Sequence, residues 1–343
     1  MALTETALTT ASLRARMLGR TGMSISRVGF GAWAIGGPDW AVGWGAQDDQ
    51  ASIRAIRHAV ERGVNWIDTA AIYGLGHSEE VVGRALAEMP AAERPYVFTK
   101  CGQVWDPHDR YSKLRVGKPE SIRREAEQSL RRLRVEVIDL YQMHWPAEDG
   151  TPLEDYWQAL LDLKAEGKVR AVGLSNHAVG LLERAEALGH VDTLQPPLSA
   201  IRRGALAAEL PWCEAHETGV IVYSPMQSGL LSGRFSADRV AALPSDDWRS
   251  RHADFQGDAL TRNLAVADAM KPIAARQGVS PAAVAVAWAL AMPGVTGAIV
   301  GARSPEQVDG WVAAAALDLD EEDRTAIATA IRGVGAGEGP IPN

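Results

Sequence analysis

Four side chains capable of acid–base chemistry stand at or just after the ends of short apolar segments: Asp68, Tyr73, Lys100 and His144. A phenol has a pKa of about 10, too high for an efficient proton donor near neutral pH. An ammonium group beside it stabilises the tyrosinate and lowers that pKa. If Asp68 holds Lys100 charged and close to Tyr73, the phenol can protonate a carbonyl oxygen while a hydride reaches the carbonyl carbon. His144 would then orient the carbonyl or share in the donation.

These groups converge only if the segments that carry them are neighbouring strands. The chain alternates mostly apolar, strand-like segments with helix-like ones, and the apolar runs predict a parallel sheet covered by helices. This periodicity fits a doubly wound sheet as well as a barrel, but no GxGxxG links a strand to a helix. Candidate functional residues at the carboxyl ends of several strands favour a (β/α)8 TIM barrel. The expected strands cover residues 28–33, 65–67, 96–99, 137–142, 169–174, 193–195, 219–223 and 296–300.

Two further features complete the expected architecture. Gly19-Arg20-Thr21-Gly22 lies between short apolar segments and predicts an N-terminal β-hairpin over residues 17–28. Residues 225–258 and 106–118 are expected to be long loops on the carboxyl-terminal face. Helices are expected to begin after Ser78 and at Pro119, and to cover about residues 49–62, 152–166, 179–187, 205–217, 259–276, 281–290 and 305–315. We expect a flexible N-terminus over 1–14, a single barrel over 15–332 and a flexible tail over 333–343.

Composition restricts the possible functions. The net charge of −8 in 343 residues argues against a nucleic-acid surface, which needs a basic field. The two cysteines, Cys101 and Cys213, give neither a disulfide framework nor metal-ligand spacing, which suits a reducing cytoplasm. No secretory signal or membrane-length apolar run is evident. We therefore expect a cytoplasmic protein that acts on a small molecule without a metal; the sequence does not indicate its oligomeric state.

The four side chains, in this order along successive strands, resemble the catalytic tetrad of the aldo-keto reductase family, and the resemblance extends from about Arg16 to about Thr329. It implies Tyr73 as the general acid/base, supported by Asp68, Lys100 and His144. Each residue also has a structural interpretation taken singly, as a helix cap, a core aromatic, a strand-end charge or a buried histidine. It is the set of four that favours catalysis.

The resemblance also implies a nicotinamide cofactor. In the family, residues matching Ser175, Asn176 and Gln195 hydrogen-bond the carboxamide, and the tyrosine matching Tyr223 stacks on the ring. Glycines after strand seven would admit the diphosphate. The implied cofactor residues are Trp33, Asp68, Ser175, Asn176, Gln195, Tyr223, Ser224, Pro225, Met226, Ser228, Gly229, Leu230, Gly233, Arg234, Gly301, Arg303, Ser304 and Gln307.

Arg303 and Ser304 at the start of a helix suit the 2′-phosphate of NADPH, with NADH as the alternative. Arg303 also has the simpler interpretation of an exposed charge. The chain departs from the family pattern at Leu198, where an aromatic residue is common, and at Gly310-Trp311, where relatives carry an acid and an asparagine for the adenine. Trp311 could stack on the adenine or pack in the core.

The substrate is less well indicated. Tryptophans near strand ends offer flat apolar walls with an N–H group, which suits a sugar, a polyol or a cyclic ketone, although they could simply pack beneath loops. The basic residues of 106–118 could meet an anionic or polyhydroxylated substrate or form a solvated loop, and Trp248 and His252 could belong to a lid. The candidate substrate residues are Trp33, Tyr73, Trp105, His144 and Trp145.

Three functions remain open. The first is an NADPH-dependent reductase that interconverts an aldehyde or ketone and its alcohol. The second is the same enzyme working physiologically as an NAD(P)-dependent alcohol or sugar dehydrogenase. The third is a cofactor-binding regulatory subunit of the same fold, against which the intact tetrad argues.

Overall fold

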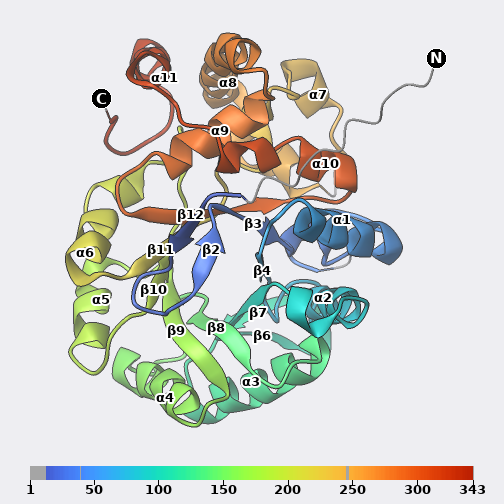
Figure 1. The fold of residues 1–343 in the computed structure, drawn as a ribbon, viewed down its shortest axis with the longest axis vertical. Coiled ribbons are helices and arrows are strands. Elements are labelled where there is room, and N and C mark those ends of the chain that lie inside the picture. Colours follow the sequence, from blue (N-terminus) through green and yellow to red (C-terminus); the bar gives the residue numbers. More distant parts are fainter. Residues whose placement is uncertain (1–12, 39, 245–246, 343) are drawn as a thin grey trace.

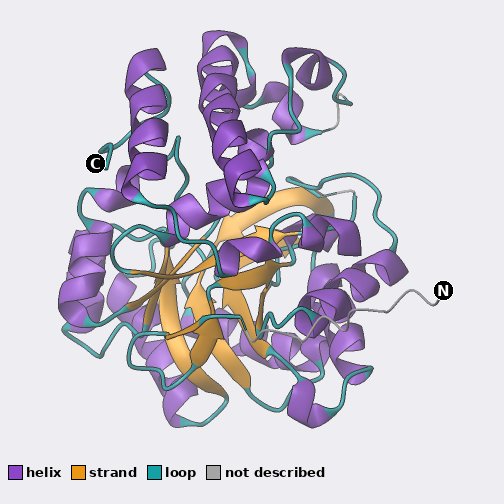
Figure 2. Ribbon diagram, turned by 45° about the horizontal axis from the view of Figure 1, so that its top comes forward, coloured by secondary structure: helices purple, strands orange, loops and turns teal. Residues whose placement is uncertain are grey.

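The computed structural model of the protein describes residues 13–38, 40–244 and 247–342. Eight parallel strands close into a barrel in the order β3-β4-β5-β8-β9-β10-β11-β12, with helices around it (Figures 1 and 2). The strands are β3 (Val28–Gly31), β4 (Trp66–Asp68), β5 (Tyr96–Cys101), β8 (Ile138–Met143), β9 (Val169–Ser175), β10 (Thr193–Gln195), β11 (Gly219–Val222) and β12 (Val295–Gly301). The predicted (β/α)8 barrel is confirmed, and each expected strand lies within two residues of its predicted ends.

Helices follow the strands, and side-chain caps mark the start of some of them. Asp48 accepts a hydrogen bond from the backbone of Gln50 at the start of α1, and Ser280 accepts one from Ala283 at the start of α9. The helices are α1 (Asp49–Glu61), α2 (His77–Ala87), α3 (Pro119–Leu133), α4 (Leu153–Ala165), α5 (Val179–Glu186), α6 (Glu209–His216), α7 (Ala237–Ala241), α8 (Gly257–Gln277), α9 (Pro281–Leu290), α10 (Pro305–Asp309) and α11 (Glu321–Val334).

Two helical expectations need correction, and one helix was not expected. The helix expected over 205–217 is broken into a 3-10 turn, Gly204–Leu206, and α6. The helix expected over 305–315 ends at Asp309 and is followed by the 3-10 turn Val312–Ala315. Helix α11, which packs on α8, was not predicted, although Asp320 caps it by accepting a hydrogen bond from the backbone of Asp323.

The barrel interior is filled by large side chains that point inward from the strands. Trp66 and Phe98 lie with ring centroids 5.3 Å apart. A Cβ atom on Gly29 would lie 2.2 Å from the Trp66 ring, so this position in β3 requires glycine. Leu18 and Ile25 reach the same cluster from the predicted hairpin, β1 (Ala15–Met17) and β2 (Ser24–Ser26). The hairpin therefore closes the end of the barrel opposite the candidate site.

The segments on the carboxyl-terminal face are more ordered than the sequence suggested. Most of the expected loop over 106–118 belongs to an antiparallel hairpin, β6 (Gln103–Asp106) and β7 (Asp109–Arg115). The irregular stretch over 225–258 contains α7 and the 3-10 turns Leu230–Ser232, Trp248–Arg251 and Ala253–Phe255. Polar alternation and short turns gave too little apolar periodicity for either to be predicted.

The structure describes the two ends of the chain to different extents. Most of the N-terminus expected to be flexible lies outside the described residues. Towards the C-terminus, the buried Arg203 guanidinium donates to the backbone carbonyls of Ala336, Gly339 and Pro340. Flexibility of the tail and the domain limits stay predictions. Within the described residues, no single helix is long and apolar enough to cross a membrane, although α8 and α9, bent by 98°, satisfy length and composition as a pair.

Candidate active site

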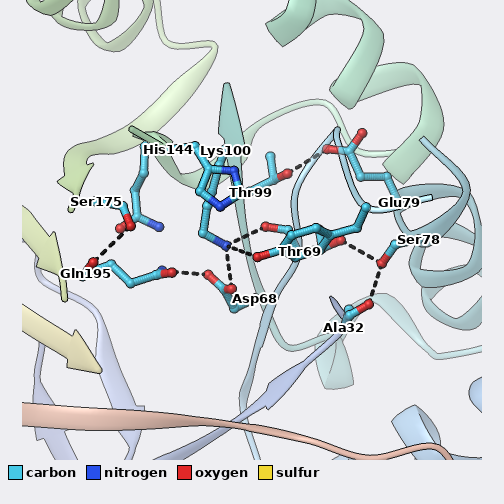
Figure 3. Close-up of polar contacts among 12 residues, drawn as sticks. Ala32, Asp68, Thr69, Ser78, Glu79, Thr99, Lys100, His144, Ser175 and Gln195 are labelled. Atoms are coloured by element: carbon cyan, nitrogen blue, oxygen red, sulfur yellow. Dashed lines mark hydrogen bonds and ion pairs between the residues drawn. The ribbon is translucent and has the colours of Figure 1, made fainter. Parts of the chain in front are cut away.

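The predicted tetrad lysine and acid form a buried ion pair at the carboxyl ends of adjacent strands. Lys100 Nζ in β5 donates to Asp68 Oδ1 in β4 at 2.5 Å and to the Thr69 carbonyl at 2.9 Å (Figure 3). The same nitrogen lies 3.4 Å from the Tyr73 hydroxyl. Parallel pairing of β4 with β5 places these ends side by side. All three ammonium protons thus have an acceptor, which a wholly buried charge requires.

The second carboxylate oxygen of Asp68 has a partner that the sequence did not suggest. Gln195 Nε2, at the end of β10, donates to Asp68 Oδ2 at 2.9 Å. Ser175 Oγ donates to the Gln195 carbonyl at 2.9 Å (Figure 3). Of the expected carboxamide ligands, Gln195 is therefore bonded directly to the tetrad, and Ser175 is connected to it through Gln195. β10 and β4 lie on opposite sides of the barrel, and the sequence does not give the distance between them. This contact could therefore not be predicted.

The acid–base properties differ from the expectation for Tyr73. Burial, with a smaller contribution from the Asp68 carboxylate, raises the pKa of Tyr73 well above its usual value. We expected Lys100 to lower it. The structure reverses the direction because burial of the phenol outweighs the lysine charge, which is shared with Asp68. Burial also raises the pKa of Asp68 and lowers that of Lys100. In this state Tyr73 is a protonated phenol at neutral pH, which is the form a proton donor needs.

His144 lies against Tyr73 as a neutral imidazole. The two ring centroids are 5.7 Å apart with the planes at 76°. Burial first, then the charges of Lys100 and Arg115, lower the pKa of His144 well below its usual value. Trp33 also stacks on Tyr73, with ring centroids 6.4 Å apart. The phenol ring thus packs against both an imidazole and an indole.

Asp68, Tyr73 and His144 open into a cavity of about 880 Å³ at the carboxyl-terminal face, whereas the buried Lys100 does not line it. Leu230, Ser304 and Trp105 do not line it either. Leu230 is buried in the core, Ser304 precedes α10, and Trp105 packs with the cluster around Trp40. The predicted residues that line the cavity are Trp33, Asp68, Tyr73, His144, Trp145, Ser175, Asn176, Gln195, Tyr223, Ser224, Pro225, Met226, Ser228, Gly229, Gly233, Arg234, Gly301, Arg303 and Gln307.

One wall beside the tetrad is a linked set of polar groups. Asn176 Nδ2 donates to the His144 carbonyl and to Ser175 Oγ, both at 3.0 Å. The Tyr223 hydroxyl donates to Asn176 Oδ1 at 2.8 Å. Asn176 has φ of 61°, in the left-handed region that asparagine tolerates better than most residues. These bonds fix the side chains of Asn176 and Tyr223 relative to His144.

The far half of the cavity is suited to phosphates. Gly229 and Gly233 have φ of 91° and 73°, which turn the backbone around the cavity wall. Four guanidinium groups border this half, and a dinucleotide carries negative charge that they would neutralise. Arg239 and Arg249 were missed because an arginine in an irregular segment gives no sequence signal of its own. The four are Arg234, Arg239, Arg249 and Arg303.

Arg303 is held by residues that precede α1. Its Nε donates to Gln47 Oε1 at 2.6 Å, and its other nitrogens donate to the carbonyls of Trp44 and Ala46. Burial and then the neighbouring Arg249 lower the pKa of Arg303. Arg249 is paired with Asp247 and lies 4.5 Å from the Trp44 ring centroid. The two guanidinium groups therefore repel each other across the cavity rim.

A closed parallel barrel with a buried Lys–Asp pair beside a phenol, next to a cavity of about 880 Å³ bordered by arginines, fits the class of nicotinamide-dependent carbonyl oxidoreductases. The sequence profile of the Aldo/keto reductase family matches residues 27–332. The chain belongs to the aldo/keto reductase family and is an NAD(P)H-dependent oxidoreductase of small carbonyl compounds.

Individual relatives agree with this assignment. The NADH-specific methylglyoxal reductase of Escherichia coli (strain K12) is 36% identical over 321 residues, covering 90% of this chain and 95% of the relative. The aldo-keto reductase YhdN of Bacillus subtilis (strain 168) is 33% identical over 310 residues, covering 90% and 91%. Among solved structures, the glycerol dehydrogenase AKR11B4 from Gluconobacter oxydans is 37% identical with a TM-score of 0.85, covering 98% of this chain and 99% of that chain.

Proposed function

We propose that this enzyme interconverts a small aldehyde or ketone and its alcohol, with Tyr73 as the general acid/base and NADPH as the preferred cofactor. The observation that carries the proposal is the Tyr73 hydroxyl, 3.4 Å from the Lys100 ammonium and bordering the cavity. A bound nicotinamide supplies the hydride. Tyr73 donates its proton to the carbonyl oxygen, and Lys100 stabilises the tyrosinate that remains.

The neighbouring groups have separate roles in this proposal. Neutral His144 orients the carbonyl oxygen towards Tyr73 without competing as an acid. Asp68 keeps Lys100 charged despite burial, and Gln195 satisfies the other Asp68 oxygen. The same groups serve the reverse reaction, in which tyrosinate accepts the alcohol proton. The direction in the cell then follows from the ratio of reduced to oxidised cofactor. The proposal therefore also covers an enzyme that works physiologically as a dehydrogenase.

Preference for NADPH rests on charge. Arg303 and Arg249 repel each other at the cavity rim, and a 2′-phosphate between them would relieve this repulsion. The E. coli relative is named NADH-specific, which makes NADH the alternative cofactor. Steady-state constants with each cofactor distinguish them. A KM for NADPH no lower than that for NADH contradicts the preference.

The substrate is proposed to be small and polar. One relative is named a methylglyoxal reductase and another a glycerol dehydrogenase, which supports a short carbonyl compound or its alcohol. The indoles of Trp33, Trp40 and Trp145 border the cavity and also admit sugar-type or cyclic ketones.

The experiment is a substrate panel followed by the absorbance of the reduced cofactor. It includes methylglyoxal, glyceraldehyde, dihydroxyacetone, aldoses, aromatic aldehydes and cyclic ketones, each with NADPH and with NADH, and glycerol with the oxidised cofactors. We expect reduction of at least one class at rates well above the protein-free control. Cofactor binding without turnover of any panel member would favour a regulatory subunit instead.

A further inference from the structure

The β6–β7 hairpin places basic side chains along the substrate side of the cavity. Arg110, Lys113 and Arg115 line the cavity, and Arg115 lies against Trp145, the residue after His144. The arginines that suit cofactor phosphates come from other segments, after β11 and β12, so they do not account for this second basic group. In a chain with a net charge of −8, composition does not account for it either.

Arg115 is the fixed member of the group. Its guanidinium lies 4.4 Å from the Trp145 ring centroid and forms an ion pair with Glu148. The backbone N–H of Glu148 donates to the Arg115 carbonyl at 2.9 Å. The end of the hairpin is thereby joined to the loop that carries His144 and Trp145. A planar guanidinium stacked on an indole presents its remaining edge for bidentate recognition of an oxyanion.

Arg115 is also near enough to the tetrad to matter for a substrate held there. Its charge contributes to the lowered pKa of His144. Glu148 is the carboxylate that lines this part of the cavity, and it is 65% exposed, whereas Arg115 is 33% exposed. The glutamate therefore pairs with Arg115 from the solvent side. Its carboxylate takes the place that an external anion would occupy, and such an anion can displace it.

We propose that Arg115, with Arg110 and Lys113, forms an anion subsite, and that the carbonyl substrate carries a carboxylate or phosphate at the end remote from the reacting carbon. Glu148 exchanges its place on Arg115 with this anion. The inference deepens the proposed function and rests on it: the tetrad holds the carbonyl oxygen, and the hairpin holds the charged end.

Matched substrates test the charge alone. 4-Carboxybenzaldehyde and methyl 4-formylbenzoate differ by one negative charge, and glyceraldehyde 3-phosphate and glyceraldehyde form the phosphate pair. We expect kcat/KM to favour the anion of at least one pair by about tenfold, through KM, and to lose this advantage at high salt. The pair with the larger ratio distinguishes carboxylate from phosphate.

Variants connect the ratio to the hairpin. Arg115→Gln should reduce the anion-to-neutral ratio about tenfold, Arg115→Lys should restore part of it, and Glu148→Gln should increase it by removing the competing carboxylate. Lys118→Gln, on an exposed lysine that does not line the cavity, is the control and should leave the ratio unchanged. Equal kcat/KM for charged and neutral partners, unaltered by Arg115→Gln, overturns the subsite while leaving the reductase intact.

A binding measurement keeps the subsite testable if no panel aldehyde is reduced. Benzoate and benzamide are titrated into the enzyme–cofactor complex and followed by tryptophan fluorescence, because Trp145 lies against Arg115. Benzoate should bind about tenfold more tightly than benzamide in the wild type and equally in Arg115→Gln. Benzoate binding no tighter than benzamide in the wild type refutes the proposal independently of turnover.

Discussion

The Nζ atom of Lys100 lies 3.4 Å from the Tyr73 hydroxyl oxygen, near the long limit of a hydrogen bond, and only 2.5 Å from Asp68 Oδ1. The lysine charge is therefore committed first to the carboxylate and only weakly to the phenol. This explains why the effect of burial outweighs that of the lysine charge, so that the pKa of Tyr73 rises. Hydrogen bonds of catalytic groups often shorten once substrate is bound, and here that shortening would move the lysine towards the tyrosinate.

Replacing Tyr73 tests its role as proton donor. Tyr73→Phe keeps the ring that packs against Trp33 and His144 but removes the hydroxyl, so turnover should fall by about two or more orders of magnitude, as expected for loss of a general acid. The dissociation constant for the cofactor, measured by fluorescence titration, should change little. The exposed Tyr111 supplies the control, Tyr111→Phe. Undiminished turnover in Tyr73→Phe would remove the residue from its proposed role.

The ion pair should dominate the stability of the site. Lys100→Met leaves the Asp68 carboxylate buried without its counter-charge, and breaking a buried pair in this way costs about 3–5 kcal/mol of unfolding free energy. Urea unfolding measures the loss. The double variant Asp68→Asn, Lys100→Met should recover part of it, because no unpaired charge remains. A double variant as unstable as the sum of both single variants would show that charge pairing is not the cause.

A buried acid behind the site should make stability depend on pH. Glu125 accepts hydrogen bonds from the Gly102 backbone and from Ser121, and burial raises its pKa from 4.5 to about 7. The unfolded chain releases this proton at lower pH than the folded chain. The free energy of unfolding therefore falls as pH rises from about 4.5 to about 7, and the penalty persists above 7.

Glu125→Gln removes this penalty. The variant should be more stable than the wild type above pH 7, by at most about 3 kcal/mol because one pKa unit is worth about 1.4 kcal/mol, and should lose the advantage near pH 4. Denaturant midpoints across this range provide the measurement. Glu136→Gln, at an exposed position, is the matched control. A parallel pH dependence of the wild type and Glu125→Gln would contradict the raised pKa.

The convergence of Asp68, Lys100 and His144 could be predicted because these residues lie at or next to the ends of strands. Parallel strands bring their carboxyl ends to one face, so an Asp and a Lys that end adjacent strands must meet. The Gln195–Asp68 bond could not, since it joins strands on different sides of the barrel. Arg249 could not be predicted either, because it lies in an irregular segment that gives no periodic signal. The direction of the Tyr73 pKa needed the burial of the phenol, which no local pattern encodes.

The contacts of Arg303 give a test of cofactor preference that distinguishes two roles. In one, Arg303 leaves Gln47 and binds the 2′-phosphate; in the other, it only anchors the segment before α1. If Arg303 binds the phosphate, Arg303→Ala should weaken NADPH binding about tenfold or more relative to NADH binding, since a charged hydrogen bond is lost. If Arg303 only anchors the segment, the variant should weaken the binding of both cofactors equally.

Gln47→Ala separates the anchor from the charge. This variant frees the Arg303 Nε–H while keeping the guanidinium, so NADPH binding should be retained or strengthened if Arg303 contacts the phosphate. Because Trp44 and Ala46 still accept from the other nitrogens, the segment stays attached. Kd values for both cofactors, from fluorescence titration of each variant, decide the matter. A loss of NADPH binding in Gln47→Ala as large as that in Arg303→Ala, matched by an equal loss of NADH, would assign Arg303 to anchoring alone.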